Sequence, residues 1–375
     1  MKILGIETSC DETAAAVVQD GAEILSNVVV SQIDIFAEYG GVIPEVAARS
    51  HLEVILPVVD KALLEASCSW DEIDAIAVTH APGLLGSLLI GTLTARTLAI
   101  LHEKPLYAVH HLKSHVYANW LIIEDDLNDA SSETPEVDRL QLGFSSTPKF
   151  PLLALVVSGG HTQILYMPGH NQFEIIGATR DDAVGECFDK VAKILGLPYP
   201  GGPAISRVAE SGDAKKYQFP HPKVDGLDFS FSGLKTAVLR TVQKELGVPI
   251  SYPSFKLKEM LNREQMADFA ASFQQTAVDV LVEKMEKAIK QYPGVNSVVL
   301  AGGVSANSLL KNEMATLVHK IKGKDTGLSF YSPSLSLSGD NGAMVAAACY
   351  FEIESGTKPV NPYELNIYPR ISIEK

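Results

Sequence analysis

Features of secreted, membrane-spanning and metal-cluster proteins are scarce in this sequence. Its 375 residues include four cysteines, and no two of them form a CxxC pair. Such spacing disfavours a disulfide framework and a structural zinc site, and is typical of reduced thiols in a cytosolic enzyme. No apolar run approaches the roughly 20 residues that span a bilayer. An apolar strand follows Met1 and Lys2 without a signal-peptide pattern, so we expect a cytoplasmic protein with no membrane partner.

Positive charge is also in short supply. The chain has 31 Lys and Arg against 45 Asp and Glu, which gives a net charge of −14 and a pI near 5.2. Because phosphate neutralisation drives non-specific nucleic-acid binding, such a chain binds RNA or DNA poorly over most of its surface. An RNA substrate would have to meet a local basic patch, or be held partly by a partner protein.

The common nucleotide-binding fingerprints are missing as well. Two glycine-rich loops, 157–161 and 301–307, match neither GxxxxGK[ST] nor GxGxxG, which disfavours P-loop and Rossmann folds. The first loop lies between two predicted strands, and the second follows a strand and opens a helix. Backbone amides in such places can approach phosphate oxygens closely. The alternatives are an ordinary hairpin turn and a plain strand–helix turn.

What the sequence does have is an alternation of strands and helices, typical of the α/β class. An opening strand pair at 2–8 and 13–19 is echoed by a second pair at 152–157 and 162–167, which indicates an internal duplication. We expect an N-terminal lobe at 1–123, an acidic mobile insertion at 124–150 and a C-terminal lobe with a helical insertion at 151–375.

A histidine pair offers the first candidate chemistry. On a predicted helix, His111 and His115 are four residues apart, so both rings can reach one ion. Asp340 follows a strand and opens a helix, where its carboxylate could supply a third ligand. This ligand set suits zinc, iron or manganese. The alternatives are a metal-free histidine pair and an Asp340 that caps its helix.

Two acidic residues in the first predicted turn are the second candidate. Asp11 and Glu12 connect two strands, where acidic side chains are usually solvated. In a duplicated ATPase-like core, however, that turn faces the phosphates. There either carboxylate can orient a nucleophile or accept its proton.

Together these segments resemble the TsaD family of tRNA adenosine threonylcarbamoyltransferases over almost the whole chain. Eight segments carry the resemblance, in order and with similar spacing: ILGIETSCDET at 3–13, YGGVIPEVAARSH at 39–51, the HHxxxH box at 110–115, VSGGHT at 157–162, GECFDKVAKILGLPYPGGP at 185–203, LDFSFSGLKT at 227–236, AGGVSAN at 301–307 and DNGAM at 340–344. The resemblance implies an α/β fold of two duplicated actin-like ATPase (ribonuclease H-like) lobes around a central nucleotide cleft.

The resemblance also implies a reaction and a set of site residues. The threonylcarbamoyl group passes from threonylcarbamoyl-adenylate to the N6 amine of the adenosine next to the anticodon in ANN-decoding tRNAs, and AMP leaves. One divalent metal ion, iron or zinc, is expected on His111, His115 and Asp340. Asp11 and Glu12 are the candidate catalytic residues, and Lys235 is a candidate phosphate or RNA contact. The expected adenylate-binding residues are Val157, Ser158, Gly159, Gly160, His161, Asp189, Gly202 and Asn307.

Family members in bacteria work with a paralogous non-catalytic subunit and a small ATPase, so the resemblance implies a hetero-complex that binds tRNA. The sequence departs from the family pattern within the histidine box. There Leu112, Lys113 and Ser114 replace Met-Glu-Gly, which changes the charge beside the expected metal.

Three other functions compete with this interpretation. An HxxxH metalloprotease needs Glu directly after its first histidine, where this chain has Leu112. A small-molecule kinase of the same superfamily shares the fold but does not need a paired-histidine helix. A non-catalytic scaffold paralogue should have lost the metal ligands, and this chain keeps all three.

Overall fold

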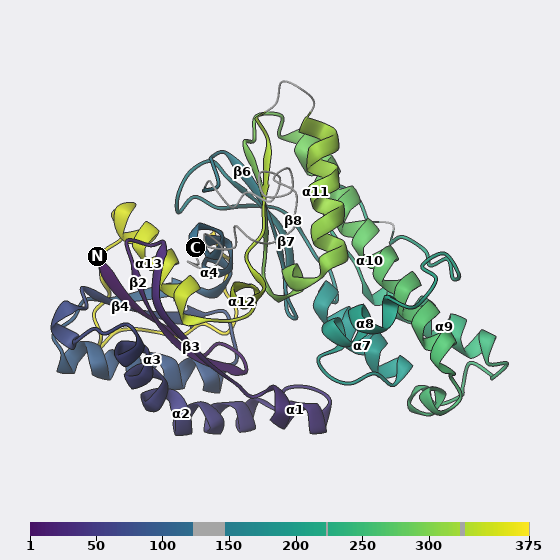
Figure 1. Ribbon diagram of the computed structural model, residues 1–375, viewed down its shortest axis with the longest axis horizontal. Helices are drawn as coiled ribbons and strands as arrows, with labels where there is room; N and C mark the ends of the chain where they lie inside the picture. The colour runs from purple at the N-terminus through teal and green to yellow at the C-terminus, as the bar shows by residue number, and fades with distance from the viewer. Residues whose placement is uncertain (123–146, 223, 323–326, 375) are drawn as a thin grey trace, which may run out of the picture.

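Two five-stranded sheets with flanking helices make up the molecule (Figure 1). The computed structural model describes residues 1–122, 147–222, 224–322 and 327–374. The predicted acidic insertion at 124–150 lies almost entirely outside the described residues. None of the helices in the described ranges combines the length and apolar character that crossing a membrane requires.

The first sheet belongs to the N-terminal part of the chain. In spatial order its strands are β3 (Glu23–Ser31), β2 (Glu12–Gln19), β1 (Lys2–Glu7), β4 (Ala75–Ala81) and β5 (Leu106–His110). The β1–β2 and β2–β3 pairs are antiparallel, and the β1–β4 and β4–β5 pairs are parallel. Helices α2 (Pro44–Glu65) and α3 (Leu85–Leu101) pack on one face and bury it in an apolar core.

The second sheet repeats this arrangement strand for strand. Its order is β8 (Glu174–Ala178), β7 (Thr162–Met167), β6 (Leu152–Val157), β9 (Ser297–Ala301) and β10 (Ser329–Tyr331). Again the first two pairs are antiparallel and the last two are parallel. Strand β8 was not foreseen from the sequence. The predicted α/β class and the predicted duplication into two lobes are both confirmed.

Helices inserted into the second half form its outer layer. They are α7 (Val184–Leu195), α8 (Gly201–Ala209), α9 (Ser232–Glu245), the 3-10 helix η3 (Ser254–Glu259), α10 (Arg263–Gln291) and α11 (Ser308–Lys322). The glycine- and proline-rich composition of residues 199–203 favours a loop, yet α8 begins at Gly201. The Asp189 carboxylate accepts a hydrogen bond from the Gly201 amide at 2.7 Å and so caps this helix.

Two helices lie between the sheets and join the lobes. These are α4 (His111–Tyr117), which follows β5 directly, and α13 (Gly342–Glu354), near the end of the chain. One apolar core contains their inner faces together with residues of both sheets. Helix α13 approaches β1 so closely that a Cβ at Gly5 would lie 2.7 Å from the amide nitrogen of Ala346. Although α13 follows the second sheet in sequence, it therefore completes the packing of the first.

The last residues return along the first lobe and then reach the second. Val360 donates a backbone hydrogen bond to Leu106 at 2.8 Å, and Tyr368 donates one to His80 at 3.0 Å. The Glu374 carboxylate accepts a hydrogen bond from the Ile175 amide of β8 at 3.0 Å. This segment thus links the β5 edge of one sheet to the β8 edge of the other.

Candidate active site

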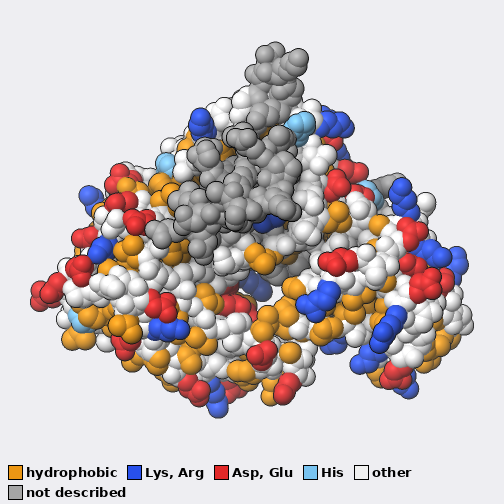
Figure 2. All heavy atoms as spheres, viewed as in Figure 1, with side chains coloured by type: hydrophobic (Ala, Val, Ile, Leu, Met, Phe, Trp, Pro, Cys, Tyr) orange, Lys and Arg blue, Asp and Glu red, His pale blue; other side chains and the backbone are white. Residues whose placement is uncertain are grey.

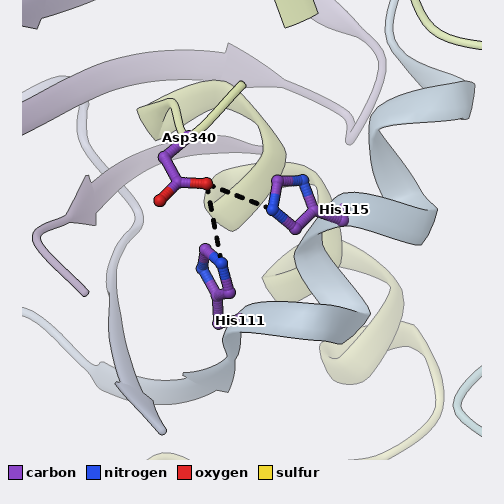
Figure 3. Close-up of side chains that lie close together, drawn as sticks. All are labelled: His111, His115 and Asp340. Atoms are coloured by element: carbon purple, nitrogen blue, oxygen red, sulfur yellow. Dashed lines mark ion pairs between the residues drawn. The ribbon is translucent and has the colours of Figure 1, made fainter. Parts of the chain in front are cut away.

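The three expected metal ligands converge between the lobes (Figure 3). His111 and His115 project from one face of α4, one turn apart. Their Nε2 atoms lie 3.5 and 3.1 Å from the same oxygen, Oδ1 of Asp340. One ligand atom from each residue falls within 4.8 Å of the other two. Two imidazole nitrogens and a carboxylate oxygen at this spacing form a donor set that fits a divalent transition-metal ion.

Asp340 is available to the histidines because a neighbour caps the last helix. The Asn341 side chain accepts a hydrogen bond from the Met344 amide at 2.9 Å, which makes Asn341 the N-cap of α13. The alternative in which Asp340 serves as that cap is therefore wrong. Burial raises the pKa of Asp340, but His111 and His115 outweigh burial and lower it to about 2.

A buried acid that the sequence analysis did not single out orients one of the histidines. Glu7, at the end of β1, is fully buried, and its Oε2 lies 3.2 Å from His111 Nδ1. The same carboxylate accepts hydrogen bonds from Thr79 Oγ1, at 2.6 Å, and from the Ser9 amide. Burial opposes protonation of His111, yet Asp340 and Glu7 raise its pKa to about 9. Ser9 Oγ also lies 3.1 Å from this nitrogen. With a cation on Nε2, the ring proton would remain on Nδ1, where Glu7 and Ser9 are its neighbours.

The turn between β1 and β2 is fixed by side chains from α2 and α3. His51, fully buried on α2, places its Nε2 3.0 Å from the Cys10 carbonyl and its Nδ1 2.8 Å from Thr13 Oγ1. Ser87 donates to the same carbonyl at 3.1 Å. Burial lowers the pKa of His51, which favours a neutral ring that donates from Nε2 and accepts at Nδ1. The last histidine of the 39–51 motif thus holds the turn.

Acidic groups crowd this turn. Asp11 is buried, and Glu12 accepts a hydrogen bond from Ser31 Oγ at 3.2 Å. Burial, followed by the charges of Asp340 and Asp11, raises the pKa of Glu12 well above its usual value. A cation or a transferred proton would relieve this repulsion, so the turn suits a site that binds one or the other.

The corresponding turn of the second lobe is open. The Ser158 amide donates to the His161 carbonyl at 2.9 Å, and the His161 amide donates to Ser158 Oγ at 3.1 Å. Among the described residues, and apart from the two chain neighbours of each glycine, no atom lies within 4 Å of a Cβ placed on Gly159 or Gly160. Burial, and then the charges of His111 and His115, lower the pKa of His161 to about 4. The glycine turn of one lobe therefore faces the histidine pair of the other.

Two further elements pack against this glycine turn. A Cβ at Gly185, in the first turn of α7, would lie 2.6 Å from the Ser158 carbonyl oxygen. Gly302, at the end of β9, has φ +88° and touches the Val157 carbonyl. Only glycine permits these approaches. Val157 and Ser158 are thus held at the junction of β6, α7 and β9, close to the first turn of one helix.

On the second lobe, Asp189 and Tyr199 lie near the acidic turn of the first. Burial raises the pKa of Asp189, the hydrogen bond from Gly201 opposes this, and the charge of Asp11 adds to it. Burial, and then Asp11 and Asp189, raise the pKa of Tyr199. Gly202, in the first turn of α8, has open space where a side chain would be. Tyr199 was missed because it stands in a stretch rich in glycine and proline, with no spacing that links it to Asp11.

Two other residues that were expected to contact substrate, Asn307 and Lys235, have protein groups as their observed neighbours. Asn307 caps α11: its Oδ1 accepts from the Leu310 amide at 3.1 Å, and its Nδ2 donates to Gln274 at 2.9 Å and Ser206 at 3.2 Å. These contacts use both of its amide hydrogens, and direct nucleotide contact by Asn307 stays a prediction. Lys235 lies on α9 in the neighbourhood of Asp182. Its role as a phosphate or RNA contact also stays a prediction.

Lys113, which departs from the family pattern in the histidine box, contacts residues outside the candidate metal site. Lys113 Nζ lies 3.8 Å from Glu352 of α13 and 3.2 Å from Asn171 Oδ1. Burial raises the pKa of Glu352 to about 7, and Lys113 opposes the rise. The positive charge at position 113 is therefore balanced by α13.

Comparisons with known proteins come from both structure and sequence. The solved activator of 2-hydroxyisocaproyl-CoA dehydratase from Clostridium difficile aligns with 96% of this chain and 100% of its own, at 14% identity and a TM-score of 0.45. Among curated proteins, the tRNA N6-adenosine threonylcarbamoyltransferase of Symbiobacterium thermophilum is 46% identical over 372 residues, which are 99% of this chain and 96% of that protein. The Bacillus cereus protein of the same name is 45% identical over 376 residues, with 99% and 96% covered.

A family profile gives the same result. The profile described as TsaD, tRNA N6-adenosine threonylcarbamoyltransferase, matches residues 23–130 and 137–347. The matched ranges contain the histidine box, the second-lobe glycine turn and Asp340. The chain belongs to the TsaD family.

Proposed function

We propose that this protein transfers the threonylcarbamoyl group from threonylcarbamoyl-adenylate to the N6 amine of the adenosine next to the anticodon in ANN-decoding tRNAs. The N6 nitrogen forms a bond to the carbamoyl carbon, the bond from that carbon to the phosphate oxygen breaks, and the amine loses a proton as AMP leaves. The observation that carries the proposal is the meeting of two elements between the lobes. These are the His111, His115 and Asp340 cluster and the open glycine turn opposite it.

One divalent metal ion, iron or zinc, would be held by His111, His115 and Asp340. Their convergent donor atoms support such a site, as does the contact of Glu7 with His111 Nδ1. When bound, the ion supplies positive charge for phosphate oxygens and polarises the acyl group. The protein's own part is to keep the two Nε2 atoms and the carboxylate aimed at one point.

The adenylate would lie along the second lobe. A Cβ on Gly159 or Gly160 would meet open space, which leaves room for phosphate oxygens to approach the backbone there. Asp189 is placed to accept hydrogen bonds from ribose hydroxyls, because only one of its oxygens is bound to the Gly201 amide. His161 and Gly202 complete the proposed surface. The acyl group would then extend from the phosphate toward the acidic turn of the first lobe.

Asp11 and Glu12 are the proposed groups that position the attacking amine and accept its proton. The raised pKa of Glu12 makes its carboxylate a better proton acceptor than a solvated one. Asp11, beside it and opposite Asp189, would orient the amine. The histidine box argues against a metalloprotease. Leu112 follows His111 at the position where that class has its catalytic glutamate.

A paralogous subunit is the proposed partner, together with a small ATPase. Helices α2 and α3 lie side by side and expose leucines at helical spacing: Leu52 and Leu56 on α2, and Leu85, Leu89 and Leu93 on α3, each 43–66% exposed. Hydrophobic side chains are visible at this end of the molecule in Figure 2. A paralogue carrying an equivalent helix pair would cover this face with matching apolar surface.

The test is transfer of labelled threonylcarbamoyl from the synthetic adenylate to an ANN-decoding tRNA, with the candidate partners added. We expect wild-type protein to transfer the label and His111→Ala to lose nearly all transfer. His221→Ala, which removes an exposed histidine of the second lobe, is the control and should leave the rate unchanged. Equal transfer by wild type and His111→Ala would contradict the proposed metal site. No transfer with any combination of partners would contradict the proposed reaction.

A further inference from the structure

One stretch of the acidic chain is strongly basic. Residues 235–263, here called the basic segment, contain six Lys and Arg and two Glu, whereas the whole chain has 31 and 45. The segment comprises most of α9, the helix η3 and the start of α10, at the far end of the second lobe (Figure 1). Lys and Arg side chains are visible at this end in Figure 2, with some Asp and Glu side chains beside them. The bias is local, because the chain as a whole carries a net charge of −14.

Hydrogen bonds and buried leucines anchor the connection between α9 and α10 to the rest of the lobe. Gln243 Nε2 donates to the carbonyls of Ile250, at 3.0 Å, and Tyr252, at 3.1 Å. Leu257 of η3 is fully buried, and Leu261 is 8% exposed. These contacts fix both ends of the connection, so the path of the backbone between them is set by the fold.

Between these anchors an aromatic ring is left on the surface among cations. Phe255 is 63% exposed, and Lys256 and Lys258 on the same short helix are exposed too. The stem of Lys258 packs against Gly196 at the end of α7, which places its charge on the same surface as α7. Burying a phenylalanine is favourable, so a ring that a well-anchored helix turns outward is free to meet a ligand.

Cations beside an exposed ring match the chemistry of unpaired RNA. Lysines neutralise backbone phosphates, and the flat face of an aromatic ring stacks on a base that is not paired. We propose that the basic segment binds the tRNA substrate. Phe255 stacks on an unpaired base, and Lys256, Lys258, Arg240 and Lys244 contact the backbone. The inference rests on the proposed function, and it gives an acidic enzyme the local basic patch that RNA binding requires.

The experiment measures binding of the full chain to an ANN-decoding tRNA transcript by fluorescence anisotropy at several salt concentrations. Phe255→Ala and Phe255→Leu should each weaken binding about 10-fold, while Phe255→Trp should keep wild-type affinity. Leucine retains apolar area without an aromatic face, so it separates stacking from simple hydrophobic contact. Lys256→Glu with Lys258→Glu should weaken binding further and reduce the salt slope by about 1 to 2.

A matched control comes from the same lobe. Lys287 and Lys290 are exposed near the other end of α10, about 40 Å from Arg263 at 1.5 Å per residue. Changing both to Glu alters the net charge equally and should leave tRNA affinity and salt slope near their wild-type values. All variants change exposed residues, so thermal unfolding should be unaffected. In transfer assays the basic-segment variants should raise KM for tRNA and leave kcat nearly constant.

The outcomes separate this inference from the proposed function. If wild type transfers the group and the basic-segment variants bind tRNA as wild type does, the inference is wrong and the function stands. A loss of affinity for the paralogous subunit, with tRNA affinity intact, would instead make the segment a protein contact. If wild type binds tRNA through this segment but transfers nothing, the proposed reaction fails and the binding surface stands.

Discussion

The β1–β2 and β6–β7 hairpin turns occupy the same place in the two duplicated sheets, yet they are built in opposite ways. The β1–β2 turn is buried and held by His51 and Ser87, and it presents carboxylates. The β6–β7 turn is exposed at Gly159 and Gly160, and it presents backbone amides. A repeated fold has thus supplied two equivalent positions. The two sequences have diverged, so that the first turn carries carboxylates and the second carries glycines with an exposed backbone.

This difference matches the needs of the two ends of an acyl-adenylate. A phosphate requires donors without competing negative charge, and glycine amides supply them. The attacking amine requires a proton acceptor, which a crowded carboxylate supplies. The predictions below remove one property of one turn at a time, from the largest expected effect to the smallest.

Removing the carboxylates should have the greatest effect on rate. Asp11→Asn and Glu12→Gln should each lower single-turnover transfer by about 10²- to 10⁴-fold, with adenylate affinity little changed. Because the pKa of Glu12 is raised, the acid limb of the wild-type pH–rate profile should lie above the usual carboxyl value of 4.5, and Glu12→Gln should abolish it. The control is Glu53→Gln, an exposed acid on α2. Wild-type rates in both Asp11→Asn and Glu12→Gln would assign catalysis to the metal site and substrate alone.

Removing the support of a histidine should have an intermediate effect. Glu7→Gln weakens the acceptor for His111 Nδ1 without changing its size, and should lower metal affinity about 10- to 100-fold. Titration of the purified protein against a competing chelator measures this without any turnover. Glu72→Gln, at the surface of the same lobe, should bind metal as wild type does. Unchanged affinity in Glu7→Gln would reduce Glu7 to a structural partner of Thr79 and Ser9.

Filling the open turn should have the smallest effect, and a glycine nearby provides the contrast. Gly160→Ala puts a methyl group into empty space, so the fold should keep its stability while adenylate affinity falls about 10-fold, through loss of one hydrogen bond to a charged group. Gly302→Ala places a Cβ against the Val157 carbonyl at a positive φ and should lower the free energy of unfolding by at least about 1 kcal/mol. Calorimetric binding and thermal unfolding distinguish the two. Equal adenylate affinity in Gly160→Ala and wild type would show that the phosphate does not bind at this turn.

Much of the fold could be predicted because its signals are local. The apolar runs at 152–157 and 297–301 are strands in the structure, and the spacing of His111 and His115 places both rings on one helix face. The duplication was visible because both halves open with a strand pair around a short polar turn. Asp340 was a candidate third ligand from its place at the start of a helix, but no spacing rule joins residues that far apart, and the family resemblance supplied the link to the histidines.

What the sequence could not reveal depends on contacts between distant segments. Glu7 ends a buried strand, and nothing near it in sequence indicates that its charge meets Thr79 and His111. The start of α8 at Gly201 depends on a cap from Asp189, one helix earlier. The residues that escaped prediction are therefore those whose partners come from another part of the chain.

The packing of α13 onto β1 has a consequence for how the protein is made. A ribosome releases β1 first, and α13 emerges only after both sheets have been synthesised. Until then the part of the first sheet that α13 covers, around Gly5 of β1, is exposed, because the helix that approaches Gly5 does not yet exist. Asp340 is synthesised long after His111 and His115, so the three candidate ligands come together only near the end of translation. A nascent chain that stops before residue 342 therefore exposes apolar surface of β1, and such surface is prone to associate with other chains until α13 packs on it.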